Sequence, residues 1–179
     1  RLCLSGAEIE AALDGRRVER GAVVSAGAGA QLRLGRVTRG ARAYLCIDGE
    51  LRAAAEVPLG SLVEGEVTLR VVEGPQRDRF TEAAWDALLN AAWRASPDSD
   101  RRGIRLAGPV LEHAVLPPEI PPEGNAPGAV QVPGSGQPVV LGPDRPVTGG
   151  YPKIATVVPE DLRLLAQLRP GAPVRFARA

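Results

Sequence analysis

The stretch Glu66-Val67-Thr68-Leu69-Arg70-Val71 alternates polar and apolar side chains. A period of two places neighbouring side chains on opposite faces, so this stretch predicts a half-buried β-strand. Residues 31–34 repeat the alternation. Three continuous apolar runs are typical of strands buried on both faces, namely residues 43–47, 139–141 and 154–158. Glycine and proline separate these runs at short intervals, which favours a β-barrel or a β-sandwich.

Two short helices are expected among the strands. Thr81 is placed to cap a helix that runs from Glu82 to Arg94, in which apolar residues recur near helical spacing. A second helix begins at Pro159, because proline suits the first helical position and the acids after it suit the positive end of the helix dipole. Residues 174–176 resemble a last strand. The sequence therefore predicts a mainly β protein with two short helices.

The composition excludes several classes of function. The chain has 179 residues, of which 44% are hydrophobic, so it can bury a core. Its 22 basic and 21 acidic residues leave a net charge of +1, which argues against a nucleic-acid-binding protein. No apolar run approaches the roughly 20 residues that a membrane helix needs. We therefore expect a cytoplasmic protein that binds neither nucleic acid nor a membrane.

The cysteines and the histidine do not form a recognisable site. Cys3 and Cys46 lie in apolar, strand-like runs, and we expect both to be buried free thiols. A disulfide or a reactive thiol is the alternative. With one histidine, His113, the chain has no zinc-binding spacing, so no metal site is expected. The sequence also lacks a phosphate-binding loop, so we do not expect this chain to bind ATP itself.

The only lysine, Lys153, ends the run Thr148-Gly149-Gly150-Tyr151-Pro152-Lys153. The two glycines permit close backbone approach, so backbone N–H groups could hold a carboxylate there. Lys153 would add a point charge, and Tyr151 would add a hydroxyl donor. Such a site suits a small substrate with a carboxylate and an amide-like group. The alternative is a tight hairpin turn with a solvated lysine.

Three further polar residues could take part. Asp144 could orient an amide or guide a proton. If Ile104 and Leu106 face inward on a strand, Arg105 faces the other side and could bind a carboxylate bidentately. Gln131 is a polar side chain in a short strand-like segment. The alternative for the arginine cluster at residues 101–105 is a set of surface ion pairs.

Several motifs follow one another in a familiar order. They are Glu73-Gly74-Pro75-Gln76 with Phe80, Ser99 to Leu106, Gly128 to Pro133 with Gly136-Gln137-Pro138, Thr148 to Lys153, Asp161-Leu162, and Ala166 to Gly171. In this order the chain resembles the family of the 5-oxoprolinase C subunit. The family is also described as KipA-like, as allophanate hydrolase subunit 2, and as the carboxyltransferase A and B subdomains of biotin-dependent urea carboxylase.

The resemblance implies a cyclophilin-like β-barrel over residues 73–179, preceded by an N-terminal part over residues 1–72. It also predicts that this N-terminal part is truncated, and the alternative is that residues have been left out of the sequence. The family's glycine-rich start is missing, and Glu50-Leu51-Arg52 stands where the family has a Gly-Ser-Arg-Ser-Thr loop. Arg102 stands where the family has methionine.

The function that the resemblance implies is that of one component of an ATP-dependent 5-oxoprolinase complex, which hydrolyses 5-oxoproline to L-glutamate. The chain would be active only with two partners, one KipI-like and the other LamB/YcsF-like. It would bind no cofactor itself, and the complex would use ATP. One alternative is a carboxyltransferase domain, with biotin supplied by another chain. Another is a non-catalytic KipA-like regulatory module.

The resemblance also implies roles for individual residues. The expected catalytic residues are Lys153, Tyr151 and Asp144. The expected substrate-binding residues are Gln131, Thr148, Gly149, Gly150 and Arg105.

Overall fold

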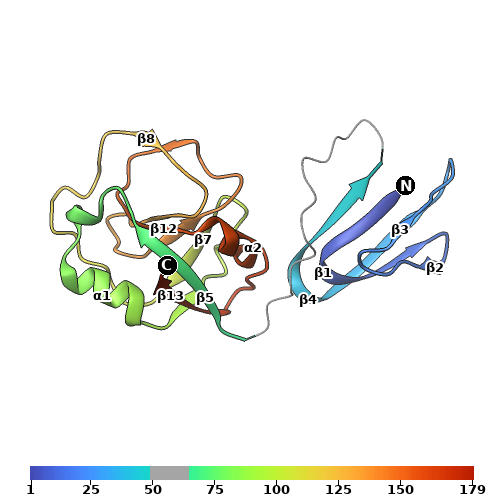
Figure 1. The fold of residues 1–179 in the computed structure, drawn as a ribbon, viewed down its shortest axis with the longest axis horizontal. Helices are drawn as coiled ribbons and strands as arrows, with labels where there is room; N and C mark the ends of the chain where they lie inside the picture. Colours follow the sequence, from blue (N-terminus) through green and yellow to red (C-terminus); the bar gives the residue numbers. More distant parts are fainter. Residues whose placement is uncertain (49–64) are drawn as a thin grey trace. The chain divides into compact units, whose positions relative to one another are not determined.

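The computed structural model describes residues 1–48 and 65–179. The chain divides into two compact units, Arg1–Glu64 and Gly65–Ala179 (Figure 1). In the described residues, every strand pairs with strands of its own unit. The stretch around Glu50, where the sequence departs from the family pattern, lies outside the described residues.

The first unit is an antiparallel sheet built around one long strand. The strands are β1 (Leu2–Leu13), β2 (Arg16–Arg17), β3 (Val23–Val24) and β4 (Leu32–Ile47), and β1 pairs with the other three. Asp14 and Gly15 join β1 to β2 with φ values of +50° and +79°. Two successive positive φ values are what a two-residue hairpin turn of type I′ requires.

One face of this sheet carries a small apolar core, and the other face is open. The core consists of Leu4, Ala11 and Val18, with further apolar side chains packed against it. We expected residues 43–47 to be buried on both faces, but Tyr44 to Ile47 are exposed. The expectation of two buried thiols is also wrong, because Cys46 is exposed and Cys3 is only half-buried. The described residues of this unit form a single layer, which cannot cover both faces of β4.

The second unit is a closed barrel. In order around the barrel, its strands are β10 (Val139–Leu141), β7 (Gly103–Ala107), β6 (Trp93–Ala95), β13 (Pro173–Arg178), β5 (Val67–Glu73), β12 (Lys153–Val157) and β9 (Ala129–Gln131). β13 and β5 run parallel, and the other neighbours run antiparallel. A separate two-stranded ribbon pairs β8 (Glu123–Gly124) with β11 (Thr148–Gly149). The mainly β barrel predicted from the sequence is confirmed.

The burial pattern of β5 explains why this strand belongs to the barrel. Val67, Leu69 and Val71 are almost completely buried, whereas the residues between them are exposed. This is the alternation that the sequence predicted for residues 66–71. Because β5 pairs with both β12 and β13, the barrel unit begins at Gly65, earlier than the boundary after residue 72 that we expected.

The helices are shorter than the sequence suggested. α1 (Glu82–Asn90) begins at the expected cap, where Thr81 Oγ1 accepts a hydrogen bond from Ala84 N at 3.0 Å. It ends before Arg94, because Trp93 enters β6 and donates its indole N–H to Leu88 O at 3.0 Å.

Two 3₁₀ turns and a second short helix complete the barrel unit. They are η1 (Arg77–Arg79), η2 (Pro159–Asp161) and α2 (Leu162–Leu165). Within the described ranges, no helix has both the length and the apolar character needed to cross a membrane.

Candidate functional site

Lys153 is the first residue of β12, and its side chain is buried. Only 3% of the side chain is exposed. The pairing of β12 with β9 shifts register between Lys153 and Ala155, so that Lys153 lies opposite Gln131 and Ala155 lies opposite Val130. A β-bulge of this kind redirects side chains locally. The alternative of a solvated lysine in a hairpin turn is therefore wrong.

Glu123 is the ionic partner of Lys153. The Lys153 Nζ and Glu123 Oε1 atoms lie 2.7 Å apart, and the glutamate side chain is 43% exposed. The contact is a close ion pair, and no other described group accepts a hydrogen bond from Nζ. The contact with Lys153 is the main reason why the pKa of Glu123 lies below its usual range. A hydrogen bond from Gln76 lowers the pKa further. The site thus pairs a buried cation with an accessible carboxylate.

Gln76 fixes this pair through three hydrogen bonds. Its side-chain Nε2 donates to Glu123 Oε1 at 2.8 Å, and its Oε1 accepts from Lys153 N at 3.1 Å. Its backbone N–H donates to Lys153 O at 3.2 Å. Gly74 makes this approach possible, because a Cβ at residue 74 would collide with the Lys153 carbonyl. The turn after β5 is therefore held tightly against the start of β12.

A second polar layer lies next to the ion pair. Buried Gln131 donates from Nε2 to Asn125 Oδ1 at 3.0 Å, and Asn125 Nδ2 donates to Pro146 O at 3.0 Å. A Cβ at Gly149 would lie 2.8 Å from Asn125 Nδ2 and 3.1 Å from Gln131 Nε2. Gly149 is also the register partner of Glu123 in the β8–β11 ribbon. The glycine therefore lets the ribbon lie close to both amides.

The structure thus brings together part of the set of residues that the sequence singled out. Lys153, Gln131 and Gly149 belong to one polar cluster. Gly150 lies beside it, with its carbonyl accepting a hydrogen bond from Ile120 N at 2.8 Å. Tyr151 is 42% exposed. Thr148 is exposed at the start of the ribbon strand β11.

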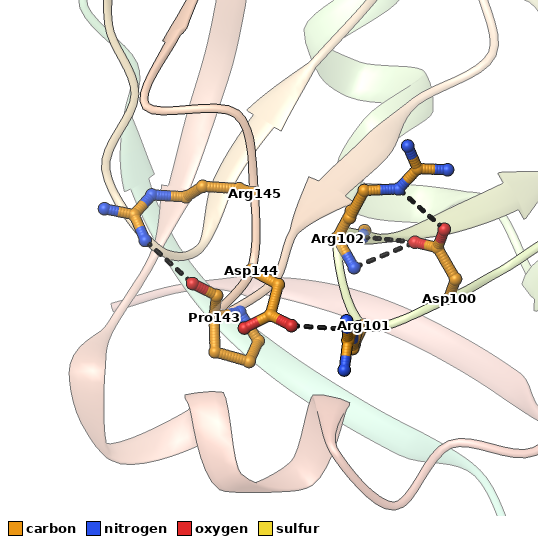
Figure 2. A network of polar contacts seen from close by, with 7 residues as sticks. Asp100, Arg101, Arg102, Pro143, Asp144 and Arg145 are labelled. Carbon is orange, nitrogen blue, oxygen red and sulfur yellow. Dashed lines mark hydrogen bonds and ion pairs between the residues drawn. The ribbon is translucent and has the colours of Figure 1, made fainter.

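Asp144 points elsewhere, into a surface network that Figure 2 shows. Its carboxylate pairs with Arg101 at 2.7 Å, while neighbouring Asp100 pairs with Arg102 at 2.8 Å. Asp100 Oδ1 also accepts from the backbone N–H groups of Arg102 and Gly103, which shapes the turn into β7. The hydrogen bonds from Arg102 hold the pKa of Asp100 below its usual range. Arg101 and Arg102 therefore form the surface ion pairs weighed from the sequence.

Arg105 faces outward on β7, as the sequence predicted. Ile104 and Leu106 on either side of it are 3% and 2% exposed, whereas Arg105 is exposed on the outside of β7. Its role in binding a carboxylate stays a prediction, as does the catalytic role of Asp144.

Glu123 and Asn125 were not singled out from the sequence. Both lie in the stretch Pro121-Pro122-Glu123-Gly124-Asn125. The sequence feature that could have identified them is a carboxylate and an amide two residues apart, directly after a stiff proline pair. In residues 1–48 and 65–179, no group of three or more histidine, cysteine or acidic side chains could hold a metal ion.

Comparisons with known proteins place the chain among carboxyltransferase-related proteins. The family model described as "Carboxyltransferase domain, subdomain A and B" matches residues 1–63 and 55–178. The chain is 31% identical over 212 residues to the 5-oxoprolinase C subunit of Escherichia coli, covering 98% of this chain and 68% of that protein. It is 46% identical over 84 residues to the 5-oxoprolinase C subunit of Haemophilus influenzae, covering 47% of this chain and 27% of that protein.

A solved structure shows the same fold at lower sequence identity. The urea amidolyase of K. lactis superimposes with a TM-score of 0.84 at 22% identity, covering 99% of this chain and 14% of the amidolyase. The chain therefore corresponds to one section of that much longer protein.

Proposed function

Because the chain belongs to the carboxyltransferase subdomain A and B family, we propose that it is one component of an ATP-dependent 5-oxoprolinase complex, which hydrolyses 5-oxoproline to L-glutamate. The names of the E. coli and H. influenzae relatives support this choice of reaction. In this proposal the chain supplies part of the substrate site and depends on two partner chains, one KipI-like and the other LamB/YcsF-like. The complex uses ATP, and this chain binds no cofactor.

The observation that carries the proposal is the incompletely satisfied ammonium group of Lys153. An ammonium has three donors, and the partner of this one is the single carboxylate of Glu123. An unpaired donor in a buried position strongly favours an incoming acceptor. The substrate 5-oxoproline offers two such acceptors, its carboxylate and its lactam carbonyl.

The chemistry of the cluster matches both ends of a lactam. Lys153 would stabilise negative charge on the substrate carboxylate or on the lactam oxygen. Glu123, whose lowered pKa keeps it ionised, would accept a hydrogen bond from the lactam N–H. Gln76 would hold both groups in place, and Tyr151 would add an accessible hydroxyl donor. Asp144, Arg105 and Thr148 are proposed to act from the surface of the same barrel, toward the substrate or the partner chains.

The decisive experiment is ATP-dependent glutamate release from 5-oxoproline by the chain mixed with its two partners. Omitting the chain should abolish the release. Lys153→Met keeps the length and the apolar stem of the side chain but removes its charge. Loss of such an electrostatic contact is expected to lower kcat/KM by about a hundredfold or more.

A matched control removes a cation that lies outside the cluster. Arg175 pairs with Glu66 at 2.8 Å, and both side chains are nearly half-exposed. Arg175→Met should therefore stay within about twofold of the wild-type rate, since exposed ion pairs contribute little. If Lys153→Met assembles with its partners and matches this control, Lys153 does not contact the substrate.

A second candidate function is transfer of a carboxyl group, with biotin supplied by another chain. The description of the matching family favours it, and the Lys153 ammonium is suited to a carboxylate. Carboxylation that depends on a biotin-bearing partner, without glutamate release, would select this function. Partner binding with neither activity would select a regulatory, KipA-like module.

A further inference from the structure

We propose that Cys3 and Cys46 form a redox-reactive pair that closes to a disulfide between β1 and β4. They are the two cysteines of the chain, and both are free thiols in the structure. They lie near the two ends of the described residues 1–48, yet they are register partners in the antiparallel β1–β4 ladder. The proposal concerns a different unit from the Lys153 cluster and does not rest on the proposed function.

The hydrogen bonds of the ladder define the geometry of the pair. Asp48 N donates to Arg1 O at 2.8 Å, and the register continues without a shift through Leu2 and Ile47 to Cys3 and Cys46. Hydrogen-bonded and non-hydrogen-bonded pairs alternate along an antiparallel ladder, so the cysteines form a hydrogen-bonded pair. Such pairs have Cα atoms about 5.5 Å apart. That separation lies inside the range of roughly 4.4 to 6.8 Å found for disulfides. The Cβ atoms of a hydrogen-bonded pair lie about 5.5 Å apart, roughly 1 Å wider than in most disulfides, so closure requires the two strands to draw together locally.

Both thiols lie on the open face of the sheet. Opposed residues of an antiparallel pair project to the same face. Leu2 and Leu4, which flank Cys3, are buried, and Leu4 belongs to the small core of the unit. Val23 is the register partner of Cys3 on the other side, and it is 64% exposed. Cys46 is exposed, so a small oxidant can reach its thiol without opening the core.

A low-molecular-weight disulfide such as oxidised glutathione supplies a balanced reaction. The Cys46 thiolate attacks the glutathione disulfide, which forms a mixed disulfide and releases one reduced glutathione. The Cys3 thiolate then attacks the Cys46 sulfur, which closes the protein disulfide and releases the second reduced glutathione. Two protein thiols are oxidised, and one small disulfide is reduced to two thiols.

The bond would join a residue near the start of β1 to a residue near the end of β4. It would close a chain loop that contains most of both strands and all of β2 and β3. Cross-linking a long loop restricts the unfolded state, so it should stabilise the first unit. Oxidation would thereby fix the register of the ladder at this end.

The test uses the full chain in glutathione redox buffers, with acid quenching, intact mass measurement and non-reducing peptide mapping. We expect a monomer lighter by two hydrogen atoms, with the peptides of Cys3 and Cys46 linked. The matched control is Cys46→Ser/Ile47→Cys, which keeps two thiols but moves one to the opposite face of β4. This control should accumulate glutathione adducts instead of an internal bond.

Thermal unfolding gives a second measurement. Oxidation should raise the Tm of the transition that includes the first unit by several degrees in the wild type, and not in the control. Glutathione adducts or disulfide-linked dimers of the wild type, in place of the internal bond, would overturn the proposal. An internal bond in the control at the same redox ratio would overturn it as well.

Discussion

At the scale of single residues, two of the ion pairs described for the barrel have one buried member. In the first, Lys153 is buried and Glu123 is partly exposed. In the second, Asp161 is only 6% exposed, whereas the side chain of Arg70 is half-exposed. Removing one partner of a buried pair costs more than removing a surface pair, because it leaves a charge or a polar group without compensation. We therefore expect that replacing one member of either pair lowers the stability of the barrel.

The Asp161 carboxylate receives three hydrogen bonds, all from Arg70, which makes it a suitable probe of stability. Its carboxylate accepts from Arg70 N at 2.8 Å, from Arg70 Nε at 3.0 Å and from Arg70 Nη2 at 2.9 Å. The hydrogen bonds from the Arg70 side chain are the main reason why the pKa of Asp161 lies below its ordinary value of 3.8. These contacts anchor the turn η2 to the strand β5.

We predict that Asp161→Asn lowers the free energy of unfolding at neutral pH by about 1 to 3 kcal/mol. A carboxylate with a depressed native-state pKa stabilises the fold above its ordinary pKa, and this stabilisation is lost as the pH falls through the native-state value. The difference between the wild type and the variant should therefore shrink below pH 3.8. Urea unfolding across this range measures it. Glu160→Gln, which changes the exposed neighbouring acid, is the control and should change stability by less than about 0.5 kcal/mol.

At the scale of secondary-structure elements, the site depends on how closely three segments approach one another. The turn after β5 lies against β12 through Gly74, whose N–H donates to Ile154 O at 2.9 Å. The β8–β11 ribbon approaches the same region through Gly149. The β-bulge at the start of β12 turns Lys153 toward the turn after β5 and the β8–β11 ribbon. The local backbone thus sets the geometry of the cluster.

Gly74→Ala should destabilise the barrel and impair the cluster. The added Cβ would collide with the Lys153 carbonyl and lie 2.6 Å from Ala155 N, so the turn or β12 must move. Overpacking of this kind costs about 1 to 3 kcal/mol, and here it also displaces Gln76. Gly124→Ala is the matched control, because a Cβ there meets no atom within 4 Å, although it neighbours Glu123. Equal Tm values for the two variants would contradict the prediction.

At the scale of the whole molecule, the barrel has the features of an independent folding unit. All of its described strand pairings lie within residues 65–179, and its core includes large, fully buried side chains such as Trp85, Trp93 and Leu69. The core of the first unit is much smaller. Small apolar cores provide little stability by themselves.

We therefore predict that a fragment of residues 65–179 folds alone. It should show a β-rich circular dichroism spectrum and one cooperative thermal transition, and it should elute as a monomer. Introducing Asp161→Asn into the fragment should lower its Tm, as in the full chain, because both partners of that ion pair are present. A fragment that lacks a cooperative transition would show that the barrel needs the first unit to fold.

Much of the barrel could be predicted from local sequence. The alternation of residues 66–71 predicted β5, the apolar run from residue 154 predicted β12, and Thr81 predicted the start of α1. The end of α1 could not be predicted in this way, because Trp93 fits a helical spacing equally well. Only pairing with β13 places it in β6.

What the sequence by itself determined is therefore the strand and helix periodicity and the motif that contains Lys153, since these depend on neighbouring residues. Only the tertiary structure decided that Lys153 is buried, that Glu123 is its partner, and that Asp144 pairs with Arg101 instead. It also decided that Cys3 lies opposite Cys46. The physical reason is the same in each case, because strand register and a single bulge determine which distant side chains meet.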